Sequence, residues 1–235
     1  MNYLDRPLKP EWIYKSLQMV VPGEKPEKYY EPYNDIAVEL VGKDGRRKTR
    51  TVLFRTFIYS FQEKTNIIEK NILIDLCKQR DFEFMQPILL AKFFIDYEIL
   101  NYLAKLINQI FDPTQEIKSS ILTTKMVENY GDFEIVKRST RAFLKTLTDF
   151  KLLKEKSLTA YIQLPKKELL PEQVKEIIKL YAISLHTNQV DLLNLDKQLF
   201  CFYKQPDLSL IANQFHNTDW EYIKGANREL LAIFK

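Results

Sequence analysis

Residues 137–153, KRSTRAFLKTLTDFKLL, decide which fold the sequence predicts. Apolar side chains in this stretch recur three and four residues apart, as on one face of an α-helix, at Phe143, Leu144, Leu147 and Phe150. Ser139 and Thr140 precede them, and a hydroxyl side chain is a favoured cap for a helix N-terminus. The stretch therefore predicts a helix that begins at one of these two residues and has a basic entry.

The sequence on either side of this helix predicts a preceding helix and a following β-hairpin. Residues 117–127 have helical spacing, and Tyr130-Gly131-Asp132 is expected to end that first helix. After the basic helix, the apolar runs 152–153 and 160–164 indicate two strands separated by a polar stretch, which predicts a small β-hairpin. Helix, turn, capped basic helix and hairpin follow one another in a winged helix-turn-helix, which we expect around residues 113–165.

The remainder of the chain is typical of a mainly α-helical protein. Proline and glycine separate the periodic segments, and we expect helices at residues 10–22, 26–40, 67–78, 84–110 with a possible break near Pro87, 173–185 and 207–215. The last run, residues 229–234, fits a helix or a strand. The predicted fold class is thus mainly α with a winged helix-turn-helix and a small β-hairpin wing.

Three regions follow from this pattern. Residues 1–82 are expected to form an N-terminal helical domain with helix-turn-helix character. Residues 83–165 would supply the long helix and the winged helix-turn-helix, and residues 166–235 a C-terminal helical extension.

The polar turn at residues 42–47 leaves two alternatives open. In the first, helices flank the turn, because the apolar residues that follow keep a helical period as far as Phe61. In the second, strands 36–41 and 49–57 pair around Asp44-Gly45, a dipeptide typical of tight hairpins. The helical period favours the first alternative.

The composition argues against several classes of catalytic and cofactor site. No two of the five glycines stand at the intervals of a Gly-x-Gly-x-x-Gly or a Gly-x-x-x-x-Gly-Lys phosphate loop. The cysteines and histidines form no metal-ligand spacing and no pair of nucleophile and base: Cys77, Cys201, His186 and His216. We therefore expect no catalytic residue, no metal ion and no cofactor.

A metal-dependent nuclease is the enzyme class that comes nearest to a match. Glu116-x-Lys118 and Asp149-x-Lys151 have the form of the second half of a nuclease motif, but the only Pro-Asp pair, Pro206-Asp207, follows both. Three-residue patterns of this kind arise by chance in a charged helical protein. The sequence therefore predicts a protein that is not an enzyme.

The sequence contains no pattern typical of export or of membrane insertion. Residues 1–7 include no apolar run, and the most apolar stretch, residues 88–103, is interrupted by Lys92, Asp96 and Glu98. We expect a cytoplasmic protein with reduced thiols and no membrane partner.

Positive charge is clustered although the formal net charge of the chain is only +4. Residues 43–50 contain five cations and one aspartate, and residues 137–156 contain seven cations and two carboxylates, so the remainder is net negative. Both clusters fall at predicted helix entries, where helix-turn-helix proteins contact bases and phosphates. We therefore predict a surface for double-stranded DNA formed by Arg46, Arg47, Lys48, Arg50, Lys137, Arg138, Ser139, Thr140, Arg141, Lys145, Lys154 and Lys156.

Two other interpretations of the basic clusters stay open. Runs of lysine and arginine are common on ordinary solvated helix faces. Winged helices also dock proteins, so the clusters could meet acidic surfaces of partner proteins.

The segment Ser139-Thr140-Arg141 and the residues up to Leu153 resemble the BREX protein A family, small proteins of bacterial BREX phage-defence loci. That family has a Ser-Thr-Arg helix leading into a Leu-x-x-x-Gly-Leu/Tyr-Leu segment, and the resemblance covers about residues 48–185. Phe150-Lys151 departs from the Ala-Gly that the family often has, and residues 192–235 look like an extension. The resemblance implies a helical, winged-helix protein that is not an enzyme, binds double-stranded DNA and works beside a methyltransferase and other defence proteins.

Overall fold

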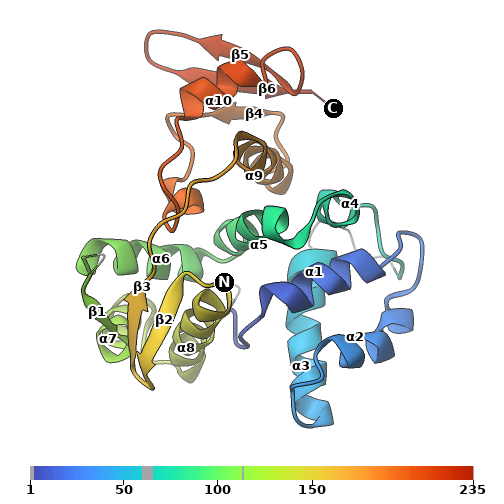
Figure 1. Ribbon diagram of the computed structural model, residues 1–235, viewed down its shortest axis with the longest axis vertical. Coiled ribbons are helices and arrows are strands. Elements are labelled where there is room, and N and C mark those ends of the chain that lie inside the picture. The colour runs from blue at the N-terminus through green and yellow to red at the C-terminus, as the bar shows by residue number, and fades with distance from the viewer. Residues whose placement is uncertain (1–2, 60–65, 113, 235) are drawn as a thin grey trace.

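The computed structural model describes residues 3–59, 66–112 and 114–234, and within them the chain is mainly helical with two small antiparallel sheets (Figure 1). In the N-terminal part, the described residues form helices joined by loops: α1 (Pro10–Met19), η1 (Pro26–Tyr29), α2 (Tyr30–Ile36), α3 (Lys43–Leu53), η2 (Phe54–Ile58) and α4 (Ile72–Gln79). The helix starts predicted at Pro10 and Pro26 are confirmed. Proline suits the first turn of a helix because the N–H that it lacks would have no partner there. The segment expected as far as residue 61 is helical to Ile58, and residues 60–65 lie outside the described part.

The alternative β-hairpin around residues 44–45 is wrong, since α3 begins at Lys43 and runs through this dipeptide. The helix also begins six residues before Thr49, so most of the stretch expected as a turn is its first turn. Gly42 makes this start possible, because its φ of +86° lies in the region that glycine adopts without steric cost. The side chain of Arg46 then closes the turn by donating to the carbonyl oxygens of Leu40 and Val38 at 2.8 and 3.3 Å.

The long helix expected at residues 84–110 is two helices, α5 (Phe82–Asp96) and α6 (Glu98–Ile110). Their boundary is Tyr97 and not Pro87, which lies inside α5. The hydroxyl groups of Tyr97 and Thr56 lie 2.5 Å apart in the core, and the extended backbone of Tyr97 separates the helices. This contact joins residues 41 positions apart, so a local sequence pattern cannot predict that the helices divide at Tyr97.

Residues 116–163 form a sheet packed against helices. A short strand, β1 (Glu116–Lys118), is followed by α7 (Ser119–Tyr130), α8 (Glu134–Asp149) and the strands β2 (Leu153–Ser157) and β3 (Ala160–Gln163). The strand order is β1-β3-β2, with β3 antiparallel to both neighbours. The hairpin and the end of α7 at Gly131 are confirmed, whereas the strand β1 has no counterpart in the predicted elements.

The N-cap predicted at Ser139 or Thr140 is wrong. Helix α8 begins at Glu134, and both hydroxyl residues lie in its interior with no exposed surface. The Thr140 hydroxyl donates to the carbonyl oxygen of Val136 at 3.0 Å, a bond available to threonine within a helix. The short segment expected before the basic helix is therefore its first turn.

The C-terminal region contains helices and also a sheet that the helical prediction for residues 166–235 leaves out. The helices are confirmed as α9 (Pro171–Ser184) and α10 (Leu208–Gln214), with a 3-10 turn η3 (Lys197–Phe200) between them. The strands β4 (Gln189–Asp191), β5 (Trp220–Lys224) and β6 (Glu229–Ile233) pair in the order β4-β6-β5. The open choice for the last run is thus settled as a strand.

Helix α5 occupies the centre of the molecule, between α1, α9 and the β1–β3 region (Figure 1). Two adjacent residues of α5, Phe93 and Phe94, contact rings from three other parts of the chain. The ring centroid of Phe93 lies 5.2 Å from that of Phe57 and 6.1 Å from that of Phe150, and the ring centroid of Phe94 lies 5.9 Å from that of Phe143 and 6.1 Å from that of Phe202. One contiguous hydrophobic core therefore joins the three predicted regions.

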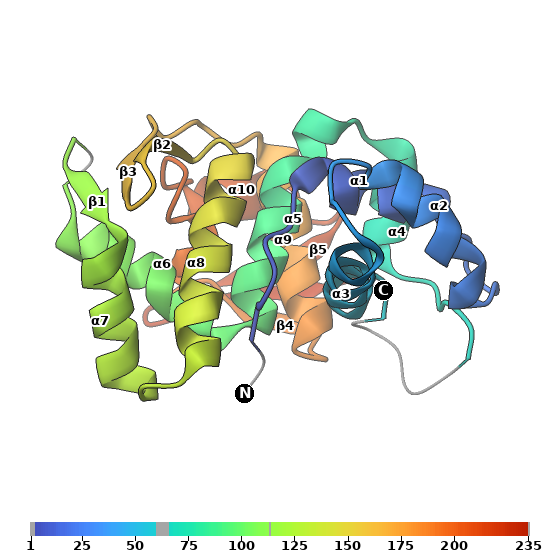
Figure 2. The same ribbon diagram turned by 90° about the horizontal axis from the view of Figure 1, so that it is seen from below.

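Residues 3–9 run along α8 before α1 begins, and Figure 2 shows this segment between α8 and α3. Leu4 and Leu8 are fully buried, and the backbone N–H of Leu8 donates to the Thr146 hydroxyl oxygen on α8 at 3.0 Å. The N-terminal segment is thus part of the packed structure.

Substituting Thr146→Val tests this attachment. The two side chains have similar shape, but valine leaves the buried N–H of Leu8 without an acceptor, so we expect the free energy of unfolding to fall by about 1–3 kcal/mol. Hydrogen exchange at the Leu8 amide should become faster in the variant. Unchanged exchange would contradict the attachment; Thr148→Val, at a partly exposed position of the same helix, is the control.

Candidate nucleic-acid interface

Arg138, Arg141 and Lys145 form a stripe of exposed cations along α8. They stand three and four residues apart, so they lie on the same face of the helix. The opposite face is apolar and buried, and its Phe143, Leu144 and Leu147 belong to the core. The amphipathic pattern of the helix thus fixes which side the cations occupy.

Carboxylates from the same region already contact two of these cations and the neighbouring Lys137. Ion pairs join Lys137 to Asp132 at 2.5 Å, Arg141 to Glu134 at 2.8 Å, and Lys145 to Asp149 at 3.6 Å. Burial raises the pKa of Asp149, and Lys145 acts in the opposite direction. Within the described residues, no carboxylate lies within ion-pair distance of Arg138, so its guanidinium is the most available one on the helix.

The β2–β3 hairpin adds Lys154 and Lys156 beside α8, and both are exposed. Lys156 pairs with Glu116 of β1 at 2.9 Å, and this hydrogen bond lowers the pKa of the Glu116 carboxyl. The tip of the hairpin presents an apolar side chain, since Leu158 is 93% exposed. The hairpin therefore offers both cations and one unburied hydrophobic group.

The N-terminal cluster divides into structural and surface cations. The Arg46 side chain holds the turn before α3, and Arg50 donates to the carbonyl oxygen of Tyr30 at 3.2 Å while its guanidinium lies 3.8 Å from the centre of that tyrosine ring. Arg47 is exposed and lies 3.5 Å from Asp44, and Lys48 is exposed. Arg47 and Lys48, together with the exposed Lys43 at the start of α3, are therefore the cations of this cluster whose side chains are available to a partner.

The elements that carry the two cation groups lie at the same end of the molecule. Figure 1 shows α8, the β2–β3 hairpin and the N-terminal end of α3 at the lower end, and Figure 2, seen from below, shows α8 and α3 on either side of the N-terminal segment. Ser139 and Thr140, in contrast, are buried, so the prediction that their hydroxyl groups contact DNA is wrong.

Arg6 belongs to this surface although the sequence pattern did not select it. Together with Asp5 and Pro7 it borders a hollow of about 320 Å³, whose other lining residues are on α8: Arg138, Arg141, Ala142 and Lys145. A single arginine outside any basic run gives no sequence signal. Its position follows only from the packing of the N-terminal segment on α8.

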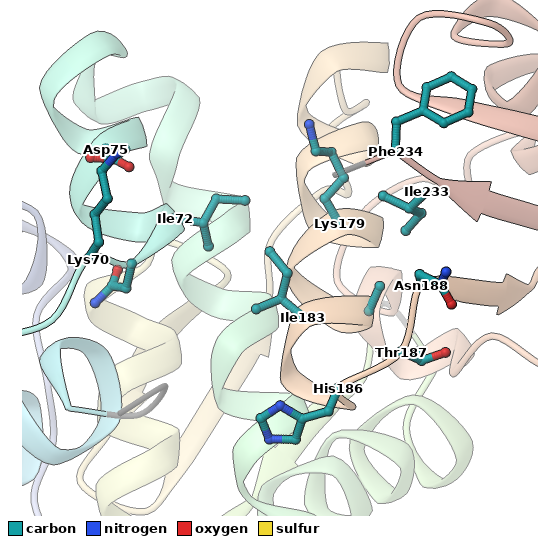
Figure 3. Close-up of a pocket in the computed structure, with 12 residues that line it drawn as sticks. Lys70, Ile72, Asp75, Lys179, Ile183, His186, Thr187, Asn188, Ile233 and Phe234 are labelled. Carbon is teal, nitrogen blue, oxygen red and sulfur yellow. The ribbon is translucent and has the colours of Figure 1, made fainter. Parts of the chain in front are cut away.

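A cavity of about 780 Å³ lies elsewhere, between α4, the end of α9 and the last strand (Figure 3). Its polar groups carry mixed charge, including Lys70 and Asp75 from one side and Lys179 and His186 from the other. Lys179 is already bound to Asp219 at 3.0 Å. The cavity therefore lacks the gathered positive charge of the α8 face.

Of the cysteines and histidines that sequence analysis considered for catalysis, His186 is exposed, and the other three are buried or hydrogen-bonded. Burial raises the pKa of the Cys77 and Cys201 thiols to about 12, which leaves almost no thiolate at neutral pH. His216 accepts a hydrogen bond from the backbone N–H of Tyr222 at its Nδ1 atom. In the part of the chain that the structure describes, no group of three or more histidine, cysteine or carboxylate side chains could hold a metal ion.

Across residues 3–59, 66–112 and 114–234, no helix has both the length and the apolar character that a membrane span requires. No family model, curated protein or solved structure matches the chain with significance.

The division of the N-terminal cluster is testable by stability measurements. Arg50→Ala removes a hydrogen bond and a cation–π contact with Tyr30, so we expect urea unfolding to show a loss of about 1–2 kcal/mol. Lys48→Ala on the same helix should change the free energy of unfolding by less than about 0.5 kcal/mol. Equal effects of the two substitutions would refute the division.

Proposed function

We propose that this chain is a double-stranded DNA-binding protein in which residues 98–163 form a winged helix-turn-helix. In this proposal α8 is the recognition helix and enters the major groove, and the β2–β3 hairpin is the wing beside it. The observation that carries the proposal is the stripe of Arg138, Arg141 and Lys145 along the one exposed face of α8.

The order and pairing of the elements support this assignment. Helix α6, strand β1, helices α7 and α8, and the antiparallel pair β2 and β3 follow one another, and β3 lies between β1 and β2. Helix α7 packs on α8 with only a short turn at Gly131 between them. A helix supported in this way is held with its polar face outward, as a helix that reads a groove must be.

The electrostatics of the face also support a polyanionic partner. Exposed ion pairs contribute little free energy, so Arg141 can exchange Glu134 for a phosphate at small cost, whereas the Asp149 partner of Lys145 is largely buried. Each phosphate that is neutralised releases counterions and adds to affinity. Lys154 of the wing and Arg47 and Lys48 of α3 would extend the contact along the duplex.

The biological setting is proposed from the sequence resemblance and from DNA binding together. A non-enzymatic DNA-binding component of a BREX-like phage-defence system would meet host and phage DNA in the cytoplasm, beside a methyltransferase. A gene for such a methyltransferase next to the gene for this chain would support that setting. Its absence together with intact DNA binding would limit the proposal to the DNA-binding activity.

Fluorescence-anisotropy titration of a labelled duplex at several salt concentrations tests the interface. We expect Arg138→Ala with Arg141→Ala to weaken binding by about tenfold or more and to make the slope of log K against log salt less steep by about two. The reason is the loss of two phosphate contacts. Glu134→Gln should instead tighten binding, because it removes a carboxylate from the face and frees Arg141.

The control carries the same loss of charge at a distance from α8. Lys224 and Arg228 are exposed in the β5–β6 hairpin, which lies at the opposite end of the molecule (Figure 1). Lys224→Ala with Arg228→Ala should leave affinity and salt slope nearly unchanged. If this control weakens binding as much as the α8 variant does, the assignment of the interface is wrong.

A protein-docking function is the second candidate, and two exposed apolar side chains favour it. Leu158 at the hairpin tip is 93% exposed, and Phe133 in the turn before α8 is 61% exposed. A partner protein that docks here would bury these apolar side chains, which the chain itself leaves exposed. The intrachain ion pairs of Lys137, Arg141, Lys145 and Lys156 also lower the charge that the face offers to DNA.

Leu158→Asp distinguishes the two candidates. If the face docks a protein, affinity purification from native cells should retain a partner with the wild type and lose it with this variant, and duplex DNA should not bind even at low salt. Tight, salt-dependent duplex binding by the wild type with no Leu158-dependent partner would exclude the second candidate.

A further inference from the structure

The hollow between the N-terminal segment and α8 is lined mostly by cations. Arg6 contributes one guanidinium from the segment, and Arg138, Arg141 and Lys145 contribute three positive groups from α8. Asp5 is the one carboxylate in the lining, and Arg141 and Lys145 pair with Glu134 and Asp149 outside it, so Arg6 and Arg138 are the lining cations without an ion pair in the described residues. Like charges gathered around one concavity repel one another unless an anion lies between them.

The Nε atom of Arg6 is a hydrogen-bond donor for which the described part of the chain supplies no acceptor. This atom is buried, and it has no hydrogen-bond partner among the described residues. Buried polar atoms are nearly always hydrogen-bonded in folded proteins, so an unpartnered guanidinium donor requires an explanation. Arg6 lines the hollow, so an external anion bound there is the nearest candidate for this acceptor.

The backbone around Arg6 is held in place without any ligand. Arg55 donates to the carbonyl oxygen of Tyr3 at 3.2 Å, and the N–H of Leu8 donates to Thr146 at 3.0 Å, so the segment is anchored on both sides of Arg6. Leu4 and Leu8 are also fully buried. A segment that is ordered beforehand loses little conformational entropy when it binds.

We infer that the hollow is a phosphate-binding site in which Arg6 completes the cation set of α8. Guanidinium groups present paired N–H donors that match phosphate oxygens, and Arg6 and Arg138 have no ion-pair partner within the described residues. The inference rests on the proposed function and extends it. The bound group is a backbone phosphate of the DNA that α8 contacts. The N-terminal segment and α8 hold this phosphate between them.

Duplex titration with Arg6 variants is the first arm of the test. We expect Arg6→Ala to weaken binding by about three- to tenfold and to make the salt slope less steep by about one, as the loss of one phosphate contact predicts. Arg6→Lys, which keeps the charge but lacks the planar donor pair, should retain part of the affinity. Arg228→Ala is the matched arginine control and should bind as the wild type does, and thermal melts by circular dichroism verify that each variant is folded.

The second arm detects the site without DNA. Inorganic phosphate is titrated into the full chain, and the Nε–H resonance of Arg6, assigned by its absence in the Arg6→Lys spectrum, is followed by NMR. A saturable shift of this resonance is the expected result. No shift of the resonance would overturn the site.

The two arms together separate the inference from the function on which it rests. If Arg6→Ala binds the duplex as Arg228→Ala does while the Arg138 and Arg141 variant binds weakly, the inference is overturned and the DNA-binding function stands. If the wild type does not bind duplex at low salt but phosphate shifts the resonance, the proposed function fails and the site takes free phosphate instead. If neither DNA nor phosphate has an effect, both are overturned.

Discussion

The packing of Phe93 and Phe94 in α5 is the interaction on which the rest of the structure depends. Consecutive residues of a helix point about 100° apart, so these two rings reach into different parts of the core. Phe93 meets Phe57 from the N-terminal helices and Phe150 from the end of α8, and Phe94 meets Phe143 within α8 and Phe202 from the C-terminal region. Burial of each such ring contributes about 1.5–3 kcal/mol. Because α5 is apolar around its circumference, it has to be covered on every side, and the three regions of the chain are its cover.

The orientation of the candidate interface is a consequence of this core. Helix α8 turns Phe143 and Leu147 toward the centre of the molecule, so its polar face, with Arg138 and Arg141, lies at the surface beside the N-terminal segment. The cations on that face are partly balanced by nearby carboxylates such as Glu134. This balance lowers repulsion in the free protein, and because exposed pairs are weak it opposes a polyanion only slightly. A face built in this way binds by exchanging ion pairs.

Contacts between distant parts of the sequence shape the same face. Leu8 and Thr146 are 138 positions apart and share a buried hydrogen bond, which brings Arg6 to the side of α8. Arg50 in the other cluster is instead held against Tyr30, whose carbonyl oxygen accepts a hydrogen bond from it and whose ring lies beside its guanidinium. Tertiary contacts thus add one cation to the surface and remove another from it. Net charge in a sequence window cannot distinguish these two cases, since it counts every arginine alike.

The sequence by itself determined the mainly helical class, most of the helix positions, the β2–β3 hairpin and the clustering of positive charge near residues 137–156. These depend on local properties: hydrophobic period, proline and glycine positions, and residue type. Only the tertiary structure decided that α8 begins at Glu134 with Ser139 and Thr140 inside it, that Tyr97 divides α5 from α6, and that β1 joins the sheet. Each of these depends on what a residue meets across the core or the sheet. A hydroxyl residue that suits an N-cap also fits a helix interior, and its neighbours in space decide between the two.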